Sequence, residues 1–168
     1  MKFIAYMFLG VFFISVILSP AVELLGIFTD KMRIDAALTA ASSAAVLTND
    51  DYNYTRDVES AIIYDDFEHR FRESFRDIFD LDLSYASRDG RFNRFHIKIT
   101  PQYRDREDNQ VKDKKDSAGR YVYNECTIRV STEYKLKTGL MKNYYEKTGK
   151  YSPFIITRTK RQTLTITN

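Results

Sequence analysis

The side chains that could perform catalysis or hold a metal ion are scarce in this sequence. Its 168 residues include one cysteine, Cys126, and two histidines, His69 and His96. One cysteine excludes an intrachain disulfide framework and a cysteine-based zinc cluster, and two histidines are too few for a His-rich metal site. The six glycines do not form a Gly-rich loop that could hold a phosphate group.

Acidic and hydroxyl side chains occur in groups, but their spacing does not match a known kind of site. Asp65 and Asp66 are neighbours on a predicted helix, where adjacent side chains point apart, so they make a poor acid–base pair. Residues 105–109 are rich in acidic side chains, yet the spacing is not that of an EF-hand and a basic residue interrupts it. Ser42 and Ser43 have no histidine near them in the sequence. We therefore predict that the protein is not an enzyme and has no cofactor, bound metal or small-molecule substrate.

A long apolar segment at the N-terminus determines where the rest of the chain lies relative to a membrane. No charged residue occurs from Phe3 to Val22, and a helix of that length is about 30 Å long, the thickness of the apolar core of a bilayer. Residues 1–28 are therefore predicted to form a retained transmembrane anchor or signal-anchor, and small residues at 19–21 leave a cleaved signal peptide as the alternative. In both cases we expect residues 29–168 to form a domain outside the cytoplasm. With the anchor retained, the chain is a single-pass membrane protein.

The apolar pattern continues past the anchor as an amphipathic stalk. From Ile27 to Ala45, apolar residues recur at steps of three, four and seven, which places them on one face of a helix. Small residues dominate the stretch AALTAASSAAVL, and they allow neighbouring helices to approach closely. Two interpretations remain for this face: packing on the chain's own domain, or packing against copies of the chain or related subunits. The candidate interaction residues are Ile34, Leu38, Ala41, Ser42 and Ala45.

A second amphipathic helix is predicted in the segment TRDVESAIIYDDFEHRFRESFRDIF. Its N-cap is expected at Thr55, after a helix break at 49–51. Val58, Ile62 and the four phenylalanines of the segment lie close to one face, with charged residues opposite. We expect this Phe stripe to pack on a sheet.

The period of the apolar residues changes to that of a strand after the second helix. A turn at 88–90 separates the first two alternating segments. The order of elements predicts an α+β fold, with the long N-terminal helix, the second helix and a four-stranded, mainly antiparallel sheet. The predicted strands lie at about 81–85, 95–99, 122–136 and 154–166.

Two features of the predicted sheet concern exposure. Cys126 falls on the apolar face of the strand at 122–136, so we expect a buried, reduced thiol. Between the second and third strands, more than half of the residues in 101–120 are charged. This composition predicts an exposed loop.

Charge is distributed unevenly along the chain. Acidic residues outnumber basic ones in 20–90, whereas 135–168 is strongly basic. These unlike charges could pair within one chain or between two copies. Nucleic acid is a third partner that the basic segment would suit, but we do not expect it for an exported domain.

The arrangement resembles pilin-like proteins, and among them the TadE-like minor pilins of tight-adherence (Tad) pilus systems. The resemblance rests on VELLGIF running into KMRIDAALTAASSAAVL, and on TIRVSTEYKLKTGLM followed by FIITRTKRQTLTIT. It implies a structural subunit of a pilus or secretion-type assembly, whose partners are membrane lipid and copies of itself or other pilin-like subunits. The alternative is an anchored or secreted domain that binds an extracellular ligand.

Overall fold

The computed structural model describes residues 2–47, 62–88, 90, 92–105, 108–115, 119, 121–148 and 154–163. In this part of the chain, a long N-terminal helix, two shorter helices and antiparallel strands confirm the predicted α+β fold. The elements in chain order are α1 (Lys2–Leu47), β1 (Ile62–Ile63), α2 (Tyr64–Phe79), β2 (His96–Arg104), β3 (Val111–Lys112), β4 (Lys114–Lys115), β5 (Tyr121–Tyr123), β6 (Glu125–Glu133), α3 (Gly139–Thr148) and β7 (Ile155–Thr163).

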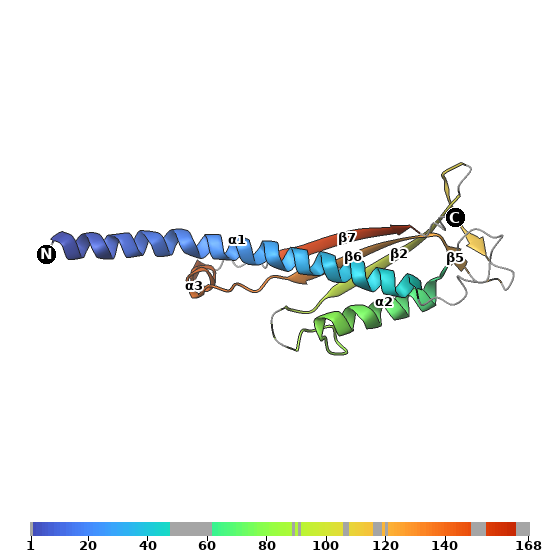
Figure 1. Ribbon diagram of the computed structural model, residues 1–168, viewed down its shortest axis with the longest axis horizontal. Helices are drawn as coiled ribbons and strands as arrows, with labels where there is room; N and C mark the ends of the chain where they lie inside the picture. The colour runs from blue at the N-terminus through green and yellow to red at the C-terminus, as the bar shows by residue number, and fades with distance from the viewer. Residues whose placement is uncertain are drawn as a thin grey trace.

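Helix α1 is a rod that extends far beyond the rest of the molecule (Figure 1). Its N-terminal part projects alone, and its C-terminal part lies along the domain. The helix has 46 residues, which corresponds to a length of about 70 Å. Pro20 lies inside the helix, which continues on both sides of it. The break predicted at 49–51 lies outside the described residues.

The main sheet contains four strands in the order β3-β2-β6-β7, and each neighbouring pair is antiparallel. A smaller sheet has the order β1-β5-β4. The single strand predicted at 122–136 is therefore divided between β5 and β6. Asn124 separates the two, because its side-chain amide bonds to the backbone N–H and C=O of Arg104 at 2.7 Å each.

The strand predicted at 81–85 is wrong. The carboxylate of Asp82 accepts hydrogen bonds from the backbone N–H groups of Ser84 (2.8 Å) and Ala86 (2.9 Å). Tyr85 has a φ of 62°, in the left-handed region that strands do not use. These contacts make a tight loop, in which apolar residues alternate without forming a strand.

The fourth strand of the main sheet comes instead from the charged segment 101–120. There β2 continues to Arg104, and β3 pairs with the end of β2. Val111 is nevertheless 54% exposed. The predicted exposure of this segment is thus confirmed for its short strand β3, but the segment is not only a loop.

Helix α2 begins at Tyr64, later than the predicted start at Thr55. Ile62 belongs to β1, where it lies opposite Tyr123 of β5. Thr55 and Val58 lie outside the described residues. The prediction that the four phenylalanines lie along one face of this helix is confirmed, because they extend from its first turn to its last residue, Phe79.

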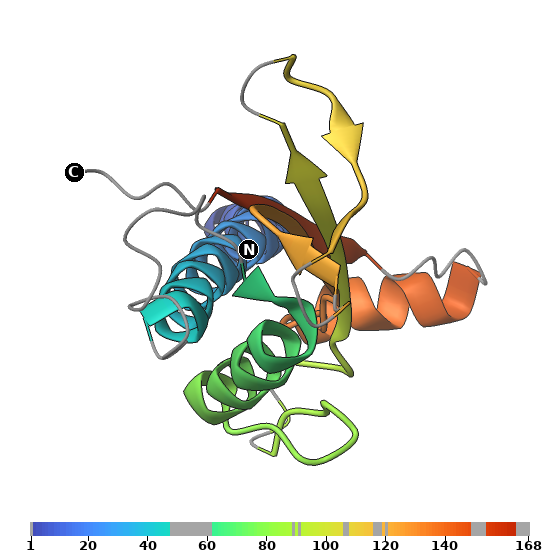
Figure 2. The same cartoon turned by 90° about the vertical axis from the view of Figure 1, so that its right-hand side faces the viewer.

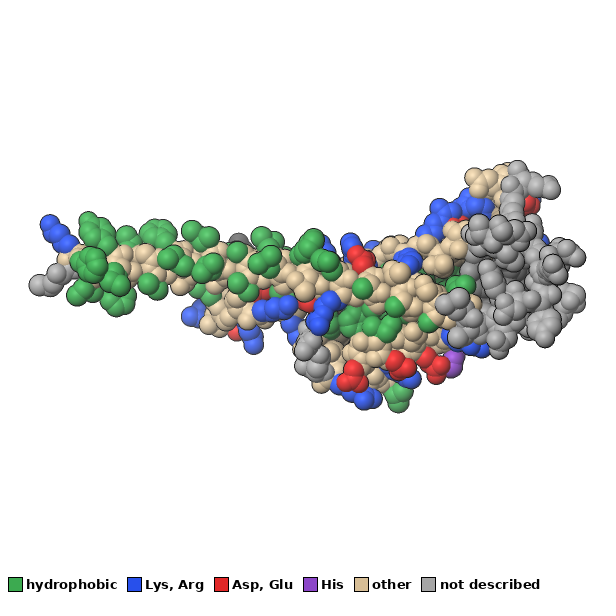
Figure 3. Space-filling model, viewed as in Figure 1, with side chains coloured by type: hydrophobic (Ala, Val, Ile, Leu, Met, Phe, Trp, Pro, Cys, Tyr) green, Lys and Arg blue, Asp and Glu red, His purple; other side chains and the backbone are tan. Residues whose placement is uncertain are grey.

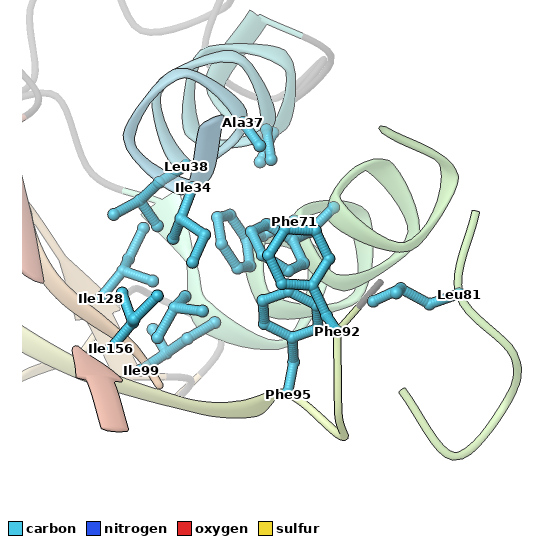
Figure 4. Packing of buried hydrophobic residues seen from close by; sticks show 14 of the residues in the cluster. Ile34, Ala37, Leu38, Phe71, Leu81, Phe92, Phe95, Ile99, Ile128 and Ile156 are labelled. Carbon is cyan, nitrogen blue, oxygen red and sulfur yellow. The ribbon is translucent and has the colours of Figure 1, made fainter. Parts of the chain in front are cut away.

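The core lies between the two long helices and the main sheet. Phe67, Phe71 and Phe75 of α2 are at most 1% exposed, and they belong to the same buried cluster as Ile128 and Ile156 of the sheet. Figures 1 and 2 show α1 and α2 side by side along the domain. Figure 4 shows their buried side chains converging on those of the strands.

Candidate functional site: the anchor helix and its junction with the domain

The five candidate residues on the small-residue face of α1 are buried inside this one chain. Ile34, Ala41, Ser42 and Ala45 are 0% exposed and Leu38 is 1% exposed. Figure 4 shows Ile34 and Leu38 pointing from α1 toward the sheet. Of the two interpretations that the sequence left open, the structure therefore shows packing on the chain's own domain. In this arrangement the five side chains are not accessible to a second subunit.

The opposite side of α1 carries apolar side chains that the domain leaves uncovered. Leu25, Phe28 and Met32 are 67%, 63% and 57% exposed. Steps of three and four residues place them on one side of the helix. We call these three residues the exposed stripe. Figure 3 shows hydrophobic side chains along α1 as far as the point where the helix meets the domain.

In the N-terminal part of α1, large apolar residues are exposed all around the helix. From Phe3 to Leu18, each of them is at least 41% exposed. By length and composition, α1 is apolar enough to cross a membrane, with a mean hydropathy of 2.3 in its most apolar window. A signal sequence near the N-terminus has the same properties.

Glu23 joins the anchor helix to the domain. Its carboxylate is almost completely buried, and Oε2 accepts a 2.7 Å hydrogen bond from the hydroxyl of Tyr134. Oε1 accepts hydrogen bonds from the backbone N–H of Lys137 (2.9 Å), the backbone N–H of Thr138 (2.6 Å) and the Thr138 hydroxyl (2.8 Å). Burial and the Glu23 carboxylate raise the pKa of Tyr134, so its hydroxyl stays protonated and remains a donor.

The same carboxylate lies at the N-terminus of α3. Thr138 directly precedes this helix, and its carbonyl accepts a hydrogen bond from the backbone N–H of Lys142 at 3.1 Å. The unpaired N–H groups and the dipole of a helix N-terminus both favour a negative charge there. Glu23 therefore fixes where α3 starts relative to α1.

Two ion pairs join α1 to the domain at the two edges of its buried face. Asp30 lies 3.5 Å from Nζ of Lys137. Asp35 accepts hydrogen bonds from Nε (2.7 Å) and Nη2 of Arg158 on β7. Partly exposed pairs of this kind contribute little stability, but they define which side of the helix is turned outward. That outward side is the one that bears the exposed stripe.

The cysteine and the two histidines lie on three different elements, with Cys126 on β6, His69 on α2 and His96 on β2. Cys126 is 2% exposed, which confirms the predicted burial, and burial raises the pKa of its thiol to about 12. The side chain of His69 is 72% exposed and lies 3.5 Å from Glu73. His96 is exposed on β2. Within the described ranges, no group of three or more His, Cys, Asp or Glu side chains is arranged to hold a metal ion.

Known proteins provide no further guide to this junction. A scan against protein-family models, a search among curated proteins and a search among solved structures each find no match. Glu23 and the exposed stripe are therefore the two features of the chain that bear most directly on its function.

Proposed function

We propose that the protein is a non-enzymatic, single-pass membrane subunit, with its domain outside the cytoplasm, that assembles with copies of itself or with other pilin-like subunits. The observation that carries the proposal is the exposed stripe of Leu25, Phe28 and Met32, which extends the apolar surface of α1 beyond the charge-free segment 3–22. The resemblance to pilin-like proteins supports the same role.

Lipid is the partner that suits the first part of this surface. The charge-free segment 3–22 is as long as the apolar core of a bilayer is thick. Its side chains are exposed all around the helix, and no described part of the domain covers them. Lipid chains on every side of the helix are the environment such a segment requires.

The exposed stripe requires a different partner. Glu23 is already bonded to the domain through Tyr134 and Thr138, so the stripe, which follows Glu23 in the chain, belongs to the part of α1 that lies along the domain. Burying one large apolar side chain is worth about 1.5–3 kcal/mol. A contiguous exposed apolar surface of this kind is typical of a protein interface. Because the inner face of α1 is occupied by the domain, the stripe is the face that a second subunit can reach.

Disulfide cross-linking tests the interface. Met32→Cys, in a Cys126→Ala background, is expressed in full-length protein and oxidised in native membranes. If the exposed stripes of two subunits face each other, we expect a disulfide-linked dimer. The matched control is Arg33→Cys, the next residue, which is also exposed but is turned by about 100° around the helix. Equal cross-linking of the two variants, or none at position 32, would contradict this interface.

The anchor is tested separately. The mass of the native N-terminus distinguishes a retained segment, which begins at Met1, from a signal peptide cleaved after Ala21. A retained anchor also keeps the chain in the membrane during alkaline extraction. Protease added to intact cells or spheroplasts should digest the domain if it lies outside the cytoplasm. Protection from the protease would contradict the proposed orientation.

A further inference from the structure

Helix α3 is placed and oriented as an element of the membrane surface. Its partner Glu23 is the first residue after the charge-free segment that ends at Val22. In Figure 1, α3 is the part of the domain nearest to the N-terminal end of α1. Figure 1 shows α3 nearly end-on and α1 lengthwise, whereas Figure 2 shows α3 lengthwise and α1 nearly end-on. The two helices are thus roughly perpendicular, so α3 runs parallel to the membrane plane if α1 crosses the membrane.

No side chain of α3 is buried, and most of them are exposed. Leu140 and Tyr144 are 48% and 58% exposed, and a spacing of four residues places them on one face. Tyr145 packs against the ring of Phe154, with ring centroids 6.0 Å apart, and Phe154 is itself 44% exposed. Exposed aromatic residues of this kind are enriched at the boundary between lipid and water.

Lysines accompany these aromatic residues. Lys142 and Lys147 are exposed on α3, and neither forms an ion pair with any acidic side chain that the structure describes. The segment from residue 135 onward, to which α3 belongs, is strongly basic. At 100° per residue, Lys147 lies on the same side of α3 as Leu140 and Tyr144, one turn after Tyr144, whereas Lys142 lies on the opposite side. A short helix with exposed apolar, aromatic and lysine side chains suits the headgroup region, where a long lysine side chain can extend to a lipid phosphate.

We propose that α3 is an interfacial helix that binds anionic phospholipid headgroups, with Leu140 and Tyr144 toward the bilayer, Lys147 beside them on a lipid phosphate, and Lys142 on the outer side of the helix, where it adds positive charge near the anionic surface. The proposal rests on the membrane anchor of the proposed function. The Glu23 carboxylate then has a second role, because it sets the height and direction of α3 at the level where the apolar segment of α1 ends.

Depth-sensitive labelling tests the position of α3. Full-length protein with Cys126→Ala and Tyr144→Cys is labelled with nitrobenzoxadiazole and reconstituted into vesicles of phosphatidylcholine with one third phosphatidylglycerol. The label at position 144 should react with added dithionite several times more slowly than a label on Val111→Cys. Val111 is 54% exposed and lies in β3, at the end of the domain far from the N-terminus.

The lysines are tested in the same vesicles. Quenching of the label by spin-labelled phosphatidylglycerol should exceed quenching by spin-labelled phosphatidylcholine. A basic residue near an anionic surface contributes about fivefold to binding, so the variant Lys142→Gln/Lys147→Gln should lose most of the preference. The matched control is Lys115→Gln/Lys160→Gln, which removes the same number of charges from β4 and β7 and should keep the preference.

The outcomes separate the two proposals. If the protein floats with the vesicles but the label at 144 is as accessible as the label at 111, the anchor stands and the interfacial position of α3 is overturned. If the label is protected without preference for phosphatidylglycerol, recognition of anionic headgroups is overturned. If the protein does not float with the vesicles at all, the anchor fails and the role of α3 fails with it.

Discussion

The hydroxyl of Tyr134 donates a 2.7 Å hydrogen bond to Glu23, which lies 111 residues earlier in the chain. Both side chains are buried, at 2% and 5% exposure. This contact joins the end of β6 to the anchor helix. Because Thr138 bonds to the other oxygen of the same carboxylate, one side chain of α1 holds both the end of the sheet and the start of α3.

Removal of the Glu23 carboxylate should destabilise the domain more than removal of one of its donors. Glu23→Ala leaves the Tyr134 hydroxyl and two backbone N–H groups without their acceptor, and we expect a loss of about 3 kcal/mol in the free energy of unfolding. Tyr134→Phe removes a single bond and should cost about 1–2 kcal/mol. Urea unfolding of the full-length protein in detergent, followed by tyrosine fluorescence, measures both. Equal losses would show that the other three bonds contribute nothing.

Gly26 should not tolerate alanine, although alanine usually favours a helix by about 1 kcal/mol over glycine. A Cβ atom at this position would lie 2.4 Å from the hydroxyl oxygen of Tyr134 and 3.2 Å from Nζ of Lys137. Since the Tyr134 hydroxyl is bonded to Glu23, it cannot move without losing that bond. We expect Gly26→Ala to lower the midpoint of urea unfolding. Gly10→Ala is the control, because a Cβ there meets no described atom within 4 Å, and its midpoint should stay or rise.

The thiol of Cys126 should make stability fall at high pH. Its pKa is raised by burial from an ordinary value of 9.0 to about 12. Between these two values, the unfolded chain loses the proton while the folded chain keeps it, so deprotonation favours unfolding as the pH rises. The slope within that window is up to about 1.4 kcal/mol per pH unit. Tyrosine side chains also titrate in this pH range. The difference in unfolding free energy between wild type and Cys126→Ala, measured from pH 8 to pH 11, isolates the contribution of the thiol, because both proteins have the same tyrosines.

The same burial makes a kinetic prediction for Cys126. A thiol reagent added at pH 8 should modify it slowly in the folded protein and rapidly in urea. Rapid modification of the folded protein would contradict the position of this residue on the core face of β6.

Much of the fold follows from patterns in short segments. The phenylalanines from Phe67 to Phe75 recur at four-residue steps, and the structure buries them as one side of α2. Alternation likewise located β6 and β7, because both are long strands with one face in the core. At 81–85 the same alternation wrongly predicted a strand. There the Asp82 carboxylate accepts hydrogen bonds from the backbone N–H groups of Ser84 and Ala86, and these bonds close a loop.

The candidate site was harder to predict, because sequence patterns do not identify partners. The small residues around Ala41 permit close helix packing, and such packing is equally compatible with α2 of the same chain or with another subunit. Only the burial of Ile34, Leu38 and Ala41 in the chain's own core decides between them. One feature of the sequence indicates the role of Glu23. It lies on the same helix face as Ile27 and Ile34, and an acidic side chain on an apolar face needs a hydrogen-bonding partner when it is buried. Its partner at Tyr134 is too distant in sequence to be read from spacing.

The two sides of α1 should respond differently to the same substitution. Leu38 is 1% exposed in the core, whereas Met32 is 57% exposed on the exposed stripe. An aspartate in place of Leu38 would be a buried, unpaired charge, and even loss of a buried leucine side chain costs about 2–5 kcal/mol. Leu38→Asp should therefore unfold the domain or greatly lower its urea midpoint. Met32→Asp should leave that midpoint unchanged, because its side chain already faces solvent.

Association should show the reverse pattern. In native membranes, chemical cross-linking of wild type should yield oligomers, and Met32→Asp should abolish them because a charge replaces an apolar contact between subunits. A milder core variant, Leu38→Ala, remains folded at low temperature and should keep the oligomers despite its lower stability. Loss of oligomers in Leu38→Ala with retention in Met32→Asp would place the contact on the inner face, and it would require the domain to open before subunits assemble.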